Sequence, residues 1–174
     1  MFIALIPMAT VLAALSLGLF YFSLWKTNQY QLKRINGKQL LYLQLVRKLA
    51  QVLLGATLCY TGLLHLTSRR VEFQAQVPSW LPFEPDFVVI ASGVVEIALG
   101  LSLLTLWKYR KEVGIATAFF FLIIFPGNVW QYIDGIDAFG LNTDQERGIR
   151  LLFQPLLVLW ALWSTGSILK KKSV

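Results

Sequence analysis

The sequence contains few charges, one cysteine and one histidine, and each shortage excludes a class of protein. Only 14% of its 174 residues are charged, compared with about 25% in a soluble domain, and the mean hydropathy is +0.61. Cys59 has no second cysteine to pair with, so dithiol redox chemistry within one chain is excluded. With one cysteine and one histidine, a conventional zinc site is not expected. The chain is predicted to be an integral membrane protein with no second folded domain.

The net charge of +7 does not indicate nucleic-acid binding. The basic residues stand in short segments between apolar runs, and such segments are the usual signals of membrane topology. We therefore expect the lipid bilayer, and no nucleic acid, as a partner.

Five apolar runs are long enough to cross a hydrocarbon core of about 30 Å. The first run has no Lys or Arg before it and exceeds a typical signal-peptide core, so we expect it to remain as a helix. The second is preceded by Gln39 to Lys48, either a short interfacial helix or the start of the span. The predicted spans are Ile3 to Trp25, Leu49 to Leu66, Phe87 to Trp107, Val113 to Tyr132 and Arg150 to Leu169.

The predicted fold class is all-α, with five transmembrane helices in four segments. Residues 1–25 form the N-terminal span and residues 26–47 a basic cytoplasmic connection. Residues 48–169 form a four-helix membrane domain, and residues 170–174 form a basic cytoplasmic tail.

The basic residues divide unevenly between the two sides of the membrane. One side receives twelve: Lys26, Lys33, Arg34, Lys38, Arg47, Lys48, Lys108, Arg110, Lys111, Lys170, Lys171 and Lys172. The other receives four: Arg69, Arg70, Arg147 and Arg150. By the positive-inside rule the N-terminus is outside and the C-terminus is in the cytoplasm. A four-span version, with the first run cleaved, keeps this orientation.

Two proline-containing segments lie at the predicted outer side. Pro78 and Pro82 flank Trp80, which favours a stiff segment at the membrane surface over the helix ends. Pro126 lacks an N–H group, so the carbonyl of Leu122 should be without its usual partner near the end of the fourth span.

Glu96 lies near the middle of the third predicted span, where an acid costs on the order of 2.5 kcal/mol or more. Gly93 and Gly100 share its helix face, and Gly55 and Gly62 share a face of the second span. Small residues let helices approach closely, so we expect Glu96 to face protein or a cavity. The alternative is a neutral structural acid bonded to a neighbouring helix.

Other polar residues should lie near the outer ends of different helices. At about 1.5 Å per residue, His65 is about 3 Å deep and Glu96 about 13 Å deep, too far apart to bond directly unless the second span extends outward or the third span starts later. We predict an outward-facing polar funnel with Glu96 at its floor. The ligand-pocket candidates are His65, Trp80, Glu96, Asn128, Arg150 and Gln154.

Four of the other candidates also have a structural alternative. His65 would sit among lipid head groups and Arg150 would snorkel to the surface. Asn128 would cap its own helix, and Gln154 would bond a neighbouring helix.

Several of these motifs together resemble DoxX-family membrane proteins. They are Gly62-x-x-His65, Val77-Pro78-x-Trp80-x-Pro82, Ser92-Gly93-x-x-Glu96-x-x-x-Gly100, Pro126-x-Asn128 and Arg150-x-x-x-Gln154, within about residues 48–169. The resemblance implies a four-helix bundle in a bacterial cytoplasmic membrane, with the first span as an addition. It also implies a link to quinone-dependent sulfur oxidation, redox-defence complexes or receptor-assembly chaperones.

Three function classes follow, and no catalytic residue or metal ligand is assigned. The first is an accessory subunit of a redox or quinone-linked membrane system. In this class His65 and Glu96 could hold a quinone head group together with three aromatic residues, Trp80, Phe125 and Trp130. The second is a non-catalytic assembly factor or chaperone for a membrane protein partner. The third is a small carrier or an enzyme that acts on lipid, with Glu96 as proton donor, or a small lipid-binding membrane protein.

Overall fold

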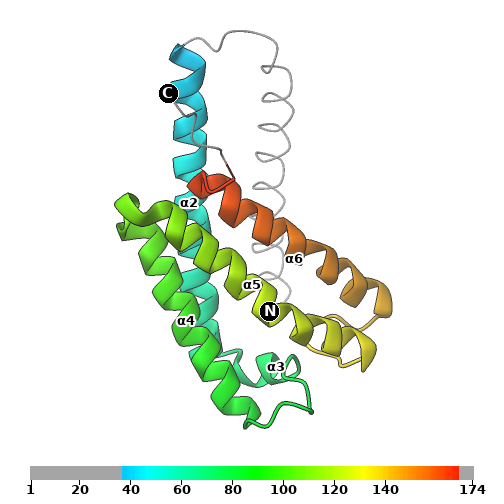
Figure 1. Cartoon of the computed structure of the whole chain (residues 1–174). Coiled ribbons are helices and arrows are strands. Elements are labelled where there is room, and N and C mark those ends of the chain that lie inside the picture. Colours follow the sequence, from blue (N-terminus) through cyan, green and yellow to red (C-terminus); the bar gives the residue numbers. More distant parts are fainter. Residues whose placement is uncertain (1–36, 169–174) are drawn as a thin grey trace. The chain divides into compact units, whose positions relative to one another are not determined.

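The computed structural model describes residues 37–168, and its elements there are all helical (Figure 1). They are α2 (Gly37–Leu66), α3 (Arg70–Gln74), α4 (Pro85–Thr105), the short 3₁₀ helix η1 (Trp107–Tyr109), α5 (Arg110–Ile133) and α6 (Asp144–Thr165). The chain divides into two parts, residues 1–50 and 51–174, and each is described by itself. The described portion of the first part is the beginning of α2.

Four segments of the described chain are long and apolar enough to cross a membrane: α2, α4, the segment from Trp107 to Ile133, and α6. The prediction of an all-α protein with several apolar spans is therefore confirmed for these residues. The first predicted span, Ile3 to Trp25, lies outside the described residues, as do the first half of the basic connection and the whole basic tail.

α2 is one continuous helix of 30 residues. Gln39 to Lys48 therefore belongs to the same helix as the second predicted span and does not form a separate interfacial helix. At about 1.5 Å per residue the helix is about 45 Å long, which exceeds a hydrocarbon core of about 30 Å.

Two pairs of glycines bring α2 and α4 into close antiparallel contact. A Cβ atom on Gly55 would lie 2.9 Å from the carbonyl oxygen of Gly100, and one on Gly62 would lie 2.7 Å from that of Gly93. Near the other end of this contact, buried Gln51 donates a hydrogen bond of 2.8 Å to the carbonyl of Leu103. These contacts fix the register of α2 against α4.

α5 and α6 lie side by side (Figure 1), with Gly114 of α5 directly against the side chain of Thr165. α6 begins at Asp144, six residues before the predicted start at Arg150. Thr143 and Glu146 form a capping box, which satisfies free N–H groups of the first turn. The helix ends before Gly166, whose φ of 77° suits glycine, and so before the predicted end at Leu169.

α5 continues through Pro126 to Ile133, one residue past the predicted end at Tyr132. At Gly127 the backbone carbonyl of Gln76 lies so close that a Cβ atom would collide with it. The connection between α3 and α4 therefore passes directly over α5. In the following segment Pro78 is buried, and Trp80 is 64% exposed.

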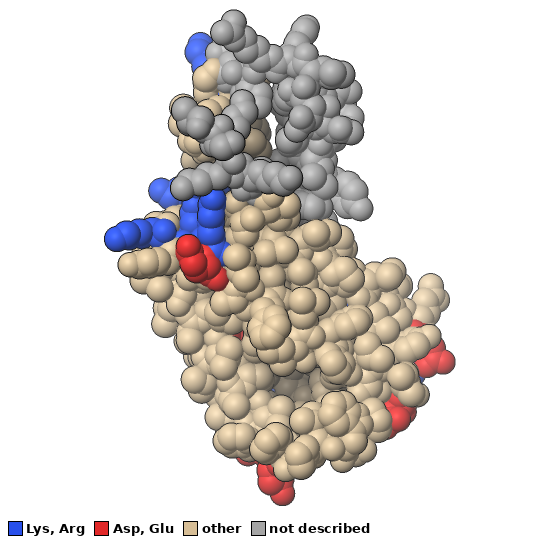
Figure 2. All heavy atoms as spheres, in the orientation of Figure 1, with Lys and Arg blue, Asp and Glu red and all other residues tan. Residues whose placement is uncertain are grey.

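The two ends of the second part differ in charge. The junction of α4 with α5 carries Lys108, Arg110 and Lys111. The connection from α5 to α6 and the first turn of α6 together carry four acids, Asp134, Asp137, Asp144 and Glu146. Figure 2 shows a broad band without charged side chains on the face that it presents. Large apolar side chains such as Phe119 and Leu152 are exposed on the helices, as expected for surfaces that meet lipid.

Candidate functional site

Buried polar side chains meet where α2 ends, α4 begins, α5 ends and α6 begins; we call this the polar end. His65 and Glu96 are 7% and 6% exposed, and His65 Nδ1 lies 3.3 Å from Glu96 Oε2. The sequence placed the two side chains at depths that differ by about 10 Å, but in the structure they are in contact. That prediction assumed that α2 and α4 end at one level, but Gly62 and His65 pack against Gly93, so α4 extends two turns beyond that contact.

No N–H or O–H group of the described residues donates a hydrogen bond to Glu96 Oε2. His65 Nδ1 lies 2.9 Å from the carbonyl oxygen of Thr61, which can only accept, so Nδ1 carries a proton and donates it there. The same N–H group is not also directed at Glu96, and Oε2 is buried without a hydrogen bond among the described residues. A buried oxygen without a partner is costly, and at a functional site it marks a group that awaits one.

A row of aromatic rings leads from His65 to Arg150. The ring of His65 stacks on Phe73 of α3 at 3.5 Å between centroids, and Phe73 meets Phe139 edge-on at 4.8 Å. The guanidinium carbon of Arg150 lies 4.5 Å from the centre of the Phe139 ring. Phe139 has a φ of 60°, a left-handed conformation that a bulky residue adopts only when its surroundings impose it.

A chain of side-chain amides joins α5 to α6 beside this row. Gln154 donates a bond of 2.6 Å to the carbonyl of Phe121, and Asn128 donates one of 3.0 Å to the oxygen of Gln154. Asn128 lies inside α5, so it does not cap its own helix. Gln154 bonds the neighbouring helix α5, as the structural alternative for this residue predicted.

The amide of Gln76, from the connection after α3, completes this cluster. One of its two terminal atoms lies 2.5 Å and 3.2 Å from the two terminal nitrogens of Arg150. The same atom lies 2.9 Å from the oxygen of Asn128 and 3.0 Å from that of Gln131. Gln76 therefore brings the α3 connection into contact with α5 and α6 at one point.

Two arginines hold α3 in position. Arg69 pairs with Glu72 within this segment, and Arg70 makes a two-pronged contact with Asp86 at the start of α4. Gln74 donates a further bond of 3.1 Å to Asp86. The hydrogen bond to Asp86 raises the pKa of Arg70 above its ordinary value, so the pair persists at any physiological pH.

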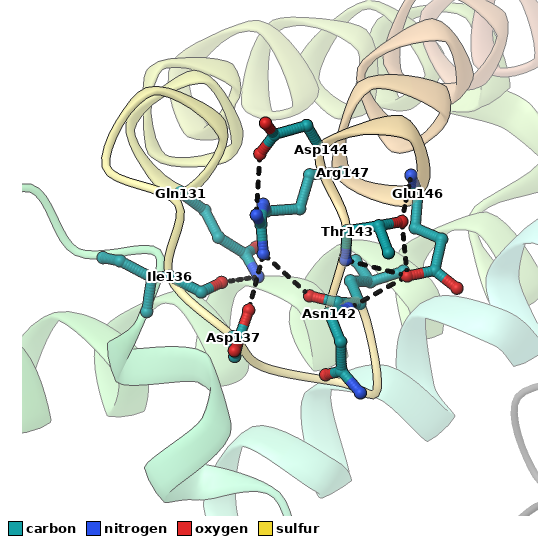
Figure 3. A network of polar contacts seen from close by, with 9 residues as sticks. Gln131, Ile136, Asp137, Asn142, Thr143, Asp144, Glu146 and Arg147 are labelled. Atoms are coloured by element: carbon teal, nitrogen blue, oxygen red, sulfur yellow. Dashed lines mark hydrogen bonds and ion pairs between the residues drawn. The ribbon is translucent and has the colours of Figure 1, made fainter.

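A second network orders the connection from α5 to α6 (Figure 3). Arg147 is 7% exposed and pairs with Asp137 at 2.6 Å and Asp144 at 2.7 Å, and it also donates to the carbonyl of Leu141. Gln131 donates to the carbonyl of Ile136 in the same connection. Phe139 lies between Asp137 and Leu141, so this network supports the segment that carries its ring.

The structure places five of the six predicted pocket residues at the polar end: His65, Glu96, Asn128, Arg150 and Gln154. Trp80 is exposed, and no hydrogen bond or ring contact joins it to them within residues 37–168. Sequence reasoning missed Phe73, Gln76, Gln131, Phe139 and Arg147. For Phe139 the sequence offered one local signal, its position between Asp137 and Gly140 in a polar connection.

One family model matches residues 54–165, more than half of the chain, and its description is "Domain of unknown function (DUF8561)". The chain belongs to the DUF8561 family. The resemblance to DoxX proteins was wrong, because the matching model is a different one. No curated protein and no solved structure matches the chain. All the residues named at the polar end, from His65 to Gln154, lie within the DUF8561 match.

Proposed function

We propose that this protein holds a lipophilic molecule by an oxygen-bearing head group at the polar end. The observation that carries the proposal is the buried Glu96 Oε2, which has no donor although His65 lies beside it. Ionisable residues within membrane segments are rare, and they usually mark binding sites or proton paths.

The chemistry of the cluster favours oxygen atoms on the ligand. The carboxyl group of Glu96 can donate a hydrogen bond as an acid or accept one as a carboxylate, and Arg150 presents five N–H donors. The row from His65 to Phe139 connects these two groups with aromatic surface. A head group with acceptor oxygens and an apolar body would suit both kinds of contact.

The position of the site follows from the charge distribution. The polar end is opposite the basic junction at Lys108, Arg110 and Lys111, and by the positive-inside rule this charge distribution supports a polar end that faces away from the cytoplasm. We retain the first predicted span, Ile3 to Trp25, and the outside N-terminus as parts of this proposal.

A quinone and a membrane lipid both have this chemistry. If the ligand is a quinone, the protein would act as an accessory subunit of a redox system whose electron carriers lie on a partner. If it is a lipid, the protein would act in lipid binding alone. The identity of the retained molecule distinguishes the two roles.

Native mass spectrometry of the full chain after gentle extraction tests the proposal. The wild type should retain one lipophilic molecule. Glu96→Gln removes the carboxyl group at nearly constant size, and it should reduce occupancy about tenfold or more, the usual effect of losing one hydrogen bond to a buried group. Glu112→Gln is the matched control, because Glu112 is an exposed acid at the opposite end.

Equal occupancy in Glu96→Gln, Glu112→Gln and the wild type would contradict the proposal. An empty wild-type protein that co-purifies with a stoichiometric protein partner would also contradict it, and would favour an assembly factor instead.

A further inference from the structure

We infer that Arg150 binds the anionic head group of a membrane lipid, and that this binding allows Gln76 to fasten the α3 connection onto α5. The inference rests on the proposed function and narrows its ligand class from oxygen-bearing to negatively charged.

Arg150 differs from the other arginines at the polar end. Arg69 pairs with Glu72, Arg70 with Asp86, and Arg147 with Asp137 and Asp144. No ion pair joins Arg150 to a carboxylate of residues 37–168, and Glu96 lies beside His65. Arg150 is half-buried, with an aromatic ring and an amide as its neighbours. A guanidinium group in such a place suits an anion with two or more oxygens.

The directions of the neighbouring amides are fixed by backbone carbonyls, which can only accept. Gln154 must donate to Phe121, so its oxygen accepts from Asn128, and the oxygen of Asn128 is turned toward Gln76. Gln131 must likewise donate to Ile136, so its oxygen is also turned toward Gln76.

Gln76 consequently faces conflicting demands at one atom. As a nitrogen, that atom donates to the oxygens of Asn128 and Gln131 but meets the N–H groups of Arg150. As an oxygen, it accepts from Arg150 but meets the two amide oxygens. Neither orientation satisfies all the groups, since every neighbour has a fixed role.

An anion on Arg150 removes the conflict. Its oxygens accept the N–H groups of Arg150 in place of Gln76, whose nitrogen is then free to donate to Asn128 and Gln131. Two hydrogen bonds then join the α3 connection to α5, beside Gly127, where the backbone of Gln76 already touches that helix. The polar end would thereby become more ordered when an anionic lipid is bound.

The test uses the full chain in nanodiscs of phosphatidylcholine, with or without phosphatidylglycerol. Native mass spectrometry after release measures the retained lipid, and hydrogen exchange measures the backbone N–H groups of Gln76 and Val77, which are bonded to the carbonyls of Phe73 and Gln74. We expect about tenfold preference for phosphatidylglycerol, typical of charge-assisted bonds, and slower exchange at Gln76 and Val77 when it is present.

Four variants separate the steps. Arg150→Gln should abolish the preference. Gln76→Glu places a carboxylate against Arg150 and should abolish it as well, in a protein that stays folded. Gln145→Glu adds the same charge at an exposed position of the same end and should leave it unchanged. Gln76→Leu should keep the preference but lose the slower exchange.

Wild-type preference for phosphatidylglycerol in Arg150→Gln or in Gln76→Glu would overturn the inference. If millimolar inorganic phosphate abolishes the preference, Arg150 binds a free anion and not a lipid head group, which would also overturn the inference. If a neutral lipophilic molecule is retained in a Glu96-dependent manner while lipid charge has no effect, the inference fails and the proposed function stands.

Discussion

Replacing Gly93 by alanine should damage both the packing of α2 on α4 and the site beside it. The new Cβ atom would lie 2.6 Å from His65 Cβ and 3.0 Å from the carbonyl oxygen of Gly62. Ordinary contacts begin near 3.4 Å, so α2 must retreat by about 0.8 Å at His65. Overpacking of this kind typically costs about 1–3 kcal/mol, and it moves His65 relative to Glu96.

The assay is reversible unfolding of the full chain in mixed micelles, followed by circular dichroism. Gly37→Ala is the matched control, because a Cβ atom there meets no atom within 4 Å. We expect Gly93→Ala to lower the free energy of unfolding by about 1–3 kcal/mol and to reduce ligand occupancy, with Gly37→Ala close to wild type. Equal stability of the two variants would refute the argument that Gly93 sets the distance between α2 and α4.

Two further predictions concern topology and capping. In a Cys59→Ser background, a cysteine at exposed Asn142 should react with an impermeant thiol reagent in intact cells, and one at exposed Lys111 should not; the reverse pattern would invert the orientation. Thr143→Ala removes the side-chain half of the capping box of α6 and should lower stability by about 1 kcal/mol, measured by unfolding in micelles; an unchanged midpoint would show that the cap is dispensable.

The sequence was sufficient to predict the helical fold, because apolar runs of sufficient length have few alternatives in a membrane. Its spacing also placed Gly55 with Gly62, and Gly93 with Gly100, on single helix faces. The register between those faces was not predictable. Each depth was counted from the end of its own helix, and the stagger that brings His65 to Glu96 depends on which glycine meets which.

The remainder of the site lies mainly in connections, where no periodicity applies. Phe73, Gln76 and Phe139 reach the cluster because α3 is held to Asp86 and the later connection is held to Arg147. Contacts between distant polar side chains have no signature in a single sequence. The DoxX resemblance failed for a related reason, since single Gly, Pro and His residues recur in many helical membrane proteins.

Photo-crosslinking from Phe139 tests the central claim most directly. A benzophenone amino acid at this position would be beside Arg150, and one at Phe119, which is 62% exposed on α5, serves as the control. After irradiation in native membranes, we expect Phe119 to capture the bulk lipid mixture. The probe at Phe139 should capture one defined lipophilic species, and this capture should be lost in Glu96→Gln. The same bulk mixture at both positions would show that the polar end holds no ligand of its own.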